Sequence, residues 1–468
     1  MAQQERIHET WLDSDRFVPS RFVRPARRFM SVEAAGGIVL LIAAVAAVVW
    51  ANMPFGETYE RFWSNHFVLE IGDLHVLDES LRELVNDALM TVFFFVVGLE
   101  IKRELVVGEL RDRKKAALPA LAALGGMIVP ALVYVFMTAG EGGEAAQGWG
   151  IPMATDIAFS IGVISLLGSR VSPGAKLFLL ALAIADDIGA IAVIAIFYTD
   201  DLSLMWLALA LAGLVIVYGA NRAGVRSILF YVVAGTAVWY FVLESGVHAT
   251  LAGVALGLMT PVFAMYSDEE YHRHSQWIVS KYEMDAASPE GRERVDADAL
   301  QLAAIARESV SPLDRLEHAL HPWSSFLIVP VFALANAGIR FADIDVGAAV
   351  TSGVALGVAF GLIFGKIVGI SVFTWAAVKL GLGKLPRRTG WAHVFGLAAL
   401  AGIGFTVSLF ITDLAFTDAL LTDQAKIGIF VGSGVAGVIG YLVLRTRPTP
   451  QEAFDAAQEA EIQGIPAS

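Results

Sequence analysis

The chain has 468 residues, of which 56% are hydrophobic and only 17% are charged. Soluble domains carry about a quarter charged residues, so this composition indicates that lipid surrounds most of the chain. The sequence contains no cysteine, which excludes disulfides, thiol catalysis, zinc–thiolate sites and iron–sulfur clusters. Any chemistry must therefore come from carboxylates, amines, imidazoles and hydroxyls.

The formal net charge of −13 does not by itself indicate a basic partner. Acidic residues cluster in the loop after Pro261 and recur in the C-terminal tail, where they would solvate exposed segments. The four arginines within 21–28 fit membrane topology better than a nucleic-acid interface, and we expect no nucleic-acid partner. We also expect no cleavable signal peptide, because the first apolar run begins only near Ala34 and is long enough to span a membrane.

Apolar runs long enough to cross a bilayer recur along the whole chain. A spanning helix needs roughly 20 mainly apolar residues. A first set of six is expected near 32–52, 84–104, 115–138, 150–168, 174–198 and 203–220. A second set of six is expected near 226–242, 245–263, 320–338, 350–379, 392–414 and 425–444.

Lys and Arg collect on alternate sides of these expected helices. They precede the first and follow the second, fourth, sixth, tenth and twelfth, whereas the opposite connections, such as 139–149, carry almost none. The positive-inside rule then predicts that both termini are cytoplasmic. The expected division is a cytoplasmic N-terminal extension 1–30, transmembrane helices 31–265, an acidic cytoplasmic loop 266–316, transmembrane helices 317–445 and an acidic cytoplasmic tail 446–468.

Two polar stretches interrupt the apolar pattern. Residues 266–316 contain eleven acidic and six basic residues, a composition typical of a solvated linker, with an amphipathic segment at Ala297–Arg307. Between the first two helices, apolar and polar residues alternate over 66–78 around Gly72-Asp73, which predicts a β-hairpin.

Four ionisable residues at expected bilayer depth are conspicuous: Asp156, Asp186, Asp187 and Lys366. A charge at the bilayer centre costs about 2.5–3.5 kcal/mol on insertion scales, so each of these residues indicates a function. A lone lysine could instead extend its amine to the membrane surface.

Asp186 and Asp187 should divide their roles. Adjacent helical residues point about 100° apart, so both carboxylates cannot face one ligand equally well. One can face a cation in a wet cavity while the other pairs with a cationic side chain, for which Lys366 is the deep candidate. Such a pair would lower the desolvation cost of both groups.

The chemistry of these groups favours an alkali cation. Carboxylate and carbonyl oxygens are hard ligands, whereas a transition metal would prefer imidazole or thiolate. Buried carboxylate oxygens can hold either a proton or a cation. Two ligands that compete for one site provide the chemical basis for exchange.

Two of the expected helices carry backbone interruptions. Gly150-Ile151-Pro152 precedes Thr155, and Gly402-Ile403-Gly404 precedes Thr406. Paired interruptions in corresponding halves indicate an inverted repeat with its binding site near the midplane. Glycines also serve close helix packing, as those at positions 361, 365 and 369 could do.

Together these residues resemble the NhaA family of sodium/proton antiporters from about Val85 to Arg445, outside 266–316. The stretches that carry the resemblance are NDALM (86–90), VGLEIKRE (97–104), ATDIAF (154–159), ALAIADD (181–187), SGVHAT (245–250), LEHALHPW (316–323) and GIGFT (402–406).

The resemblance implies an all-α membrane protein of about twelve transmembrane helices. Helices 3–5 and 10–12 would form the inverted repeat, with helices 4 and 11 broken. The implied function is that of a transporter rather than an enzyme: electrogenic, pH-regulated exchange of cytoplasmic Na⁺ or Li⁺ for external H⁺ by alternating access, for sodium and pH homeostasis. It would lie in the bacterial inner membrane and need no cofactor.

The resemblance also assigns roles to residues. Asp187 is the principal carrier of cation and proton, and Na⁺ is held at Asp187 and Asp186, with Asp186 paired to Lys366 when no cation is bound. Thr155 and Asp156 belong to broken helix 4, where Asp156 balances the positive ends of the half-helices. The residues implied in the pH response are Glu100, Glu104, His248, Glu317, His318 and His321. His248 could equally be a packing residue.

The family's dimer contact resembles the 66–78 hairpin, which implies a homodimer. The departures from the family are the N-terminal extension, the acidic tail and the long loop directly before Glu317.

Two other classes of protein also use buried carboxylates. A passive cation channel remains open on the carboxylates alone. An intramembrane aspartyl protease has Tyr-Asp and Gly-x-Gly-Asp motifs, whereas here the contexts are Thr-Asp and Ala-Asp-Asp.

Overall fold

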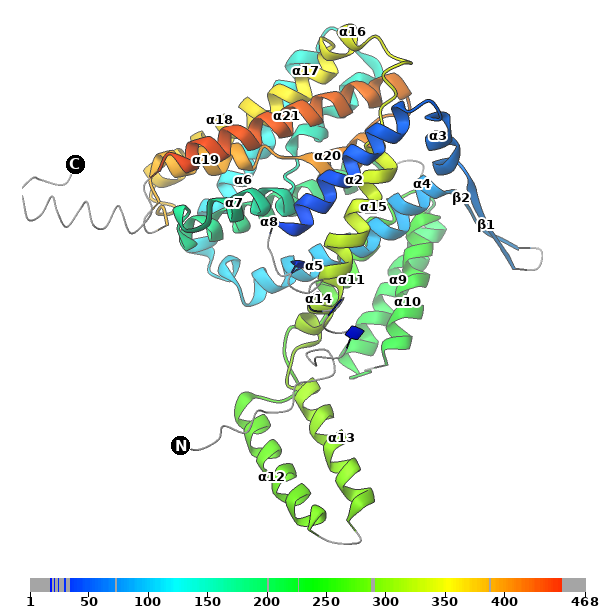
Figure 1. The fold of residues 1–468 in the computed structure, drawn as a ribbon, viewed down its shortest axis with the longest axis vertical. Helices are drawn as coiled ribbons and strands as arrows, with labels where there is room; N and C mark the ends of the chain where they lie inside the picture. Colours follow the sequence, from blue (N-terminus) through cyan, green and yellow to red (C-terminus); the bar gives the residue numbers. More distant parts are fainter. Residues whose placement is uncertain are drawn as a thin grey trace, which may run out of the picture. The chain divides into compact units, whose positions relative to one another are not determined.

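The computed structural model describes residues 34–447 except 72–73, 200–201, 226, 288–290 and 387–388, together with 17–18, 21, 24 and 29–30. The N-terminal extension and the acidic tail expected from the sequence therefore lie largely outside the described residues. The described chain is mostly helical and contains one two-stranded sheet (Figure 1).

The chain forms two compact units. The first comprises Met1–Asn86, Asp112–Tyr198 and Ser325–Ser468, and the second Asp87–Arg111 and Thr199–Ser324.

Nine helical stretches of the described residues are long and apolar enough to cross a membrane, or ten if a bent pair counts as one span. A multi-pass α-helical membrane protein is therefore confirmed. The nine are α2 (Ala35–Asn52), Leu81–Val106, α6 (Arg113–Thr138), Gly143–Arg170, α8 (Pro173–Phe197), α9 (Leu204–Arg222), Pro312–Asn336, Gly353–Lys379 and α21 (Ala419–Arg445). The helices α10 (Ile228–Leu243) and α11 (Thr250–Met259) are shorter and apolar.

The helix expected near 320–338 begins earlier than predicted, at Pro312 of α14 (Pro312–Trp323). The Ser311 side chain caps this helix by accepting a hydrogen bond from the backbone N–H of Asp314 at 3.0 Å, and proline suits the first helical turn. A polar helical start of this kind carries no hydropathy signal, so the apolar run alone placed the beginning too late.

Close glycine packing brings α6 against α18 (Lys366–Lys379) in the first unit. A Cβ on Gly365 would meet Pro130, and one on Gly369 would meet the backbone of Gly125. Small residues thus let the two backbones approach, as is usual in membrane helix packing. Lys366 directly follows a π-helical turn at Gly361–Gly365.

The segment expected to be a solvated linker contains a helical hairpin. Its helices are α12 (Asp268–Ala286) and α13 (Arg292–Glu308), which pack side by side in the second unit (Figure 1). Lys281 of α12 forms an ion pair with Asp298 of α13, which is buried. The amphipathic segment expected at Ala297–Arg307 lies within α13.

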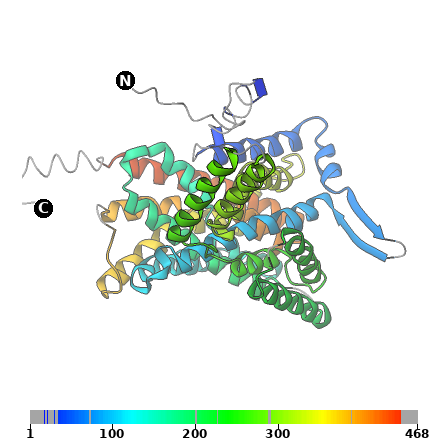
Figure 2. The same cartoon turned by 90° about the horizontal axis from the view of Figure 1, so that it is seen from below.

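The expected β-hairpin is confirmed. Strands β1 (His66–Ile71) and β2 (Leu74–Ser80) pair antiparallel, and they extend from α3 (Glu57–Trp63) and α4 (Leu81–Leu84) as Figure 2 shows. The turn predicted at Gly72-Asp73 lies outside the described residues. His66 Nδ1 lies 2.8 Å from Asp78 Oδ1 across the pair.

Candidate ion-binding site

Two interrupted helices meet in the first unit. One consists of a 3-10 helix at Gly143–Met153, an extended segment at 154–156 and α7 (Ile157–Leu167). The other consists of α19 (Trp391–Leu400) and α20 (Phe405–Ala415), bent by 48° at the break. The two breaks bind each other directly, since the backbone N–H of Asp156 donates to the carbonyl of Ile403 at 2.6 Å.

Hydroxyl groups satisfy the carbonyls that the breaks leave without helical partners. Thr155 Oγ1 donates to the Ala401 carbonyl, Ser160 Oγ to the Leu400 carbonyl and Ser408 Oγ to the Ile151 carbonyl, each at 2.8 Å. Backbone polar groups within a bilayer must be satisfied inside the protein, so these bonds allow irregular backbone at membrane depth.

Asp156 faces the N-termini of both half-helices. Its Oδ1 accepts a hydrogen bond from Phe159 N in α7 at 3.0 Å. Its Oδ2 accepts from Thr406 N at 3.2 Å and from Thr406 Oγ1 at 2.6 Å at the start of α20. One buried carboxylate, 2% exposed, therefore lies where two helix dipoles present their positive ends.

Asp186 and Lys366 form a fully buried ion pair. Lys366 Nζ donates to Asp186 Oδ2 at 2.6 Å and to Thr155 Oγ1 at 2.9 Å. The Lys366 side chain is 0% exposed and the Asp186 side chain is 1% exposed. The other carboxylate oxygen, Asp186 Oδ1, is buried and has no hydrogen-bond partner among the described residues, so it remains available to a cation or a proton.

Asp187 is the more accessible of the two adjacent carboxylates in α8. It is 9% exposed, against 1% for Asp186. The helical rotation of about 100° between neighbours separates their environments. The structure thus brings Thr155, Asp156, Asp186 and Lys366 together through direct contacts or the shared break, with Asp187 next in sequence on α8.

Comparison with known proteins gives the family. Residues 27–444 match the family described as Na+/H+ antiporter 1. The chain belongs to the NhaA family of sodium/proton antiporters. Its relatives include the Na(+)/H(+) antiporter NhaA of Syntrophobacter fumaroxidans, 45% identical over 92% of this chain and 93% of the relative. Na(+)/H(+) antiporter NhaA 2 of Sorangium cellulosum is 43% identical over 97% and 96%, and NhaA 3 of Frankia alni is 47% identical over 90% and 88%.

The residues assigned to the pH response of this NhaA chain all lie in the second unit, whereas the site residues above lie in the first. Arg103 Nη1 donates to Glu317 Oε1 at 2.5 Å, and Glu104 Oε2 accepts from Glu109 N at 3.0 Å. His318 and His321 are exposed on α14. Glu100 lies in α5 (Met90–Val106), and His248 lies just before α11. Their roles stay predictions.

Sequence reasoning missed a second polar group, at the end of α20 far from the break. Asp413 lies in α20 and Lys426 in α21, inside helices expected from the apolar runs. A search for every charged residue inside the expected apolar runs would have found both.

Proposed function

We propose that this protein exchanges cytoplasmic Na⁺ or Li⁺ for external H⁺ by electrogenic, pH-regulated alternating access. The observation that carries the proposal is the carboxylate pair on α8 beside the crossing of two interrupted helices. Among the described residues, one buried oxygen of Asp186 has no hydrogen-bond partner, and Asp187 is the more exposed carboxylate. Hard oxygen ligands of this kind suit an alkali cation.

The proposed chemistry is competition. Asp187 binds either the cation or a proton, because a cation requires the ionised carboxylate. Lys366 holds Asp186 in place when no cation is bound, and a cation that approaches Asp186 replaces part of the lysine charge. Asp156 remains bonded to both half-helices, so it fixes the geometry of the crossing and adds negative charge near the cation.

The membrane arrangement is part of the proposal. Counting α10, α11 and the bent α19–α20 pair as spans gives twelve helices, with helices 3–5 and 10–12 as an inverted repeat. The Lys and Arg distribution supports cytoplasmic termini, so α20 runs from the break toward the outer face. We place the protein in the bacterial inner membrane as a homodimer that pairs through the 66–78 hairpin.

Purified full-length protein in sealed liposomes tests the function. An imposed Na⁺ gradient should drive proton movement in the opposite direction, read with a pH-sensitive dye. Asp187→Asn keeps the side-chain shape and should abolish this coupled movement, while Asp343→Asn should retain it. Asp343 is a suitable control because it pairs with Arg340 at the surface, 57% exposed. Sodium flux without coupled protons in the wild type would indicate a channel and overturn the proposal.

A further inference from the structure

A second polar network surrounds the end of α20 that lies away from the break. We call it the outer-end network, because the proposed topology places it at the outer face. Its members come from α3, α4, α15 (Val329–Asn336), α20, α21 and the chain around them. They are Tyr59, Glu60, Arg82, Asn86, Ala335, Asn336, Gly338, Asp413, Asp423 and Lys426.

One part of this network is a chain of three polar side chains. Asn336 Nδ2 donates to Asn86 Oδ1 at 2.8 Å, and Asn86 Nδ2 donates to Asp413 Oδ2 at 2.5 Å. Asn86 lies in a π-helical turn at Val85–Leu89, and Asn336 is the last residue of α15. Both amides are buried, whereas Asp413 is exposed. A buried amide pair therefore binds one oxygen of a more exposed carboxylate.

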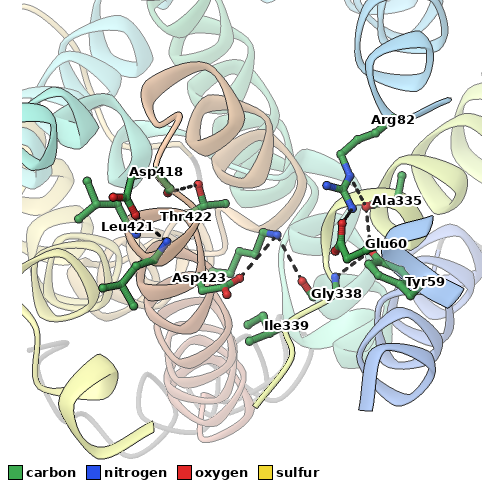
Figure 3. Close-up of polar contacts among 12 residues, drawn as sticks. Tyr59, Glu60, Arg82, Ala335, Gly338, Ile339, Asp418, Leu421, Thr422 and Asp423 are labelled. Atoms are coloured by element: carbon green, nitrogen blue, oxygen red, sulfur yellow. Dashed lines mark hydrogen bonds and ion pairs between the residues drawn. The ribbon is translucent and has the colours of Figure 1, made fainter. Parts of the chain in front are cut away.

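The turn after α15 is bound from two sides, as Figure 3 shows. On one side, Tyr59 donates its hydroxyl to the Ala335 carbonyl at 2.7 Å and accepts from Gly338 N at 3.1 Å. Arg82 Nε also donates to the Ala335 carbonyl, at 3.3 Å. On the other side, Lys426 Nζ of α21 donates to the Gly338 carbonyl at 3.3 Å.

The same two helices, α20 and α21, also reach the ion-binding crossing. Thr406 and Asp413 of α20 are seven residues apart, which is about two turns and about 10.5 Å along one helix face. The same spacing separates Lys426 from Ser433 of α21, whose Oγ accepts from Gly404 N at the break at 3.2 Å. Movement of either helix at the crossing must therefore displace its end in the outer-end network.

We propose that the Asn86–Asp413 and Lys426–Gly338 contacts form a latch that closes the outer face and that must open before the cation leaves outward. This inference rests on the proposed exchange function. Asp413 and Lys426 act as positioning residues through α20 and α21. The charged groups around Asp413 are Arg82, Glu83 and Lys426, and those around Lys426 also include Glu60 and Asp423.

The latch predicts opposite effects on the two faces of the membrane. A weakened outer contact favours the outward-open state, so the apparent affinity should fall for cytoplasmic Na⁺ and rise for external Na⁺. In both Asp413→Ala and Asn86→Ala, we expect the half-saturating concentration of cytoplasmic Na⁺ to rise and that of external Na⁺ to fall. Each change should be about threefold or more. A purely structural defect would lower the maximal rate and leave both concentrations in place.

Everted and right-side-out membrane vesicles that contain the full chain measure the two faces separately. Asp413→Asn can still bond to Asn86 and should shift both values less than Asp413→Ala. Asp343→Asn is the control for loss of an acidic surface charge. Opposite shifts support the latch. Unchanged values, or values that shift in the same direction, would overturn it while the exchange function stands. Absence of coupled exchange in wild-type vesicles would overturn the function itself.

A cross-link tests the latch in a variant that keeps the contact closed. The native chain has no cysteine, so Asn86→Cys combined with Asp413→Cys places the only two thiols at the contact. A short bifunctional thiol reagent with a reducible linker should stop exchange, and a reductant should restore it. Undiminished exchange in fully cross-linked protein would overturn the latch, because the outer face could then open without separation of Asn86 from residue 413.

Discussion

The two ends of α20 use carboxylates under different conditions. At the break, Asp156 is 2% exposed and accepts three hydrogen bonds, two of them from Thr406. At the other end, Asp413 is exposed and accepts one bond, from Asn86. Each hydrogen bond to a buried carboxylate offsets part of a high desolvation cost, whereas a more exposed carboxylate loses less when a partner leaves. The break is thus suited to constant geometry and the far end to contacts that open and close.

The largest expected effect is loss of the buried Lys366–Asp186 pair. Removal of one partner from a buried pair costs about 3–5 kcal/mol, because the other charge is left without compensation. Lys366→Ala should therefore lower the thermal stability of detergent-solubilised protein strongly. Lys426→Ala should lower it far less, since Lys426 is 14% exposed and lies 4.0 Å from Asp423. Equal losses of thermal stability in Lys366→Ala and Lys426→Ala would contradict the distinction between the ion-binding site and the outer-end network.

A double-mutant cycle isolates the pair itself. Lys366→Ala and Asp186→Asn, alone and combined, should give melting shifts that do not add, because each change removes the same interaction. Purely additive shifts would refute the pairing as a source of stability.

A smaller effect is expected from helix capping. Asp156→Ala removes the cap of α7 and the bonds to Thr406, and should cost about 2 kcal/mol of stability. Asp418 provides a matched control, since it caps the exposed N-terminus of α21 by accepting from Leu420 N at 2.7 Å, and Asp418→Ala should cost about 1 kcal/mol. Asp156→Asn should also weaken the apparent sodium affinity in liposomes without abolishing exchange. An unchanged affinity would place Asp156 outside the site's influence.

The smallest effect concerns Tyr59 of the outer-end network. Burial raises the pKa of Tyr59 to about 12, from an ordinary value of 10.0. The unfolded chain therefore loses this proton first, so stability that is present below pH 10 should be lost as the pH rises toward 12. Tyr59→Phe should start about 1 kcal/mol lower and show less of this alkaline loss. Identical pH profiles of unfolding for the two proteins would contradict the assignment.

The sequence predicted the elements of this fold better than their partners. Apolar runs placed the spanning helices, and Asp156, Asp186, Asp187 and Lys366 were conspicuous because lipid makes charges costly. The helical hairpin was missed, because a polar, charged composition is compatible with a linker as well as with a solvated helix pair. Its start does carry a signal, the capping box of Ser267 and Glu270.

The contact of Asp413 with Asn86 could not be predicted, since 327 positions separate the two residues and only the packing of α20 brings them together. The Asp186–Lys366 pair could be anticipated without a fold, because few buried cations were available to choose from. An ion pair is thus predictable where the sequence offers one buried residue of opposite charge. It is unpredictable near the membrane surface, where many polar residues are candidates.

The central claim is that a cation and a proton compete for Asp187. The most direct test measures exchange against sodium concentration at several pH values in liposomes that contain the wild-type protein. Competition predicts that the half-saturating sodium concentration rises as the pH falls, and that high sodium restores the maximal rate in acid. A half-saturating concentration that stays constant across the acidic range would contradict the account, even if the rate itself declined.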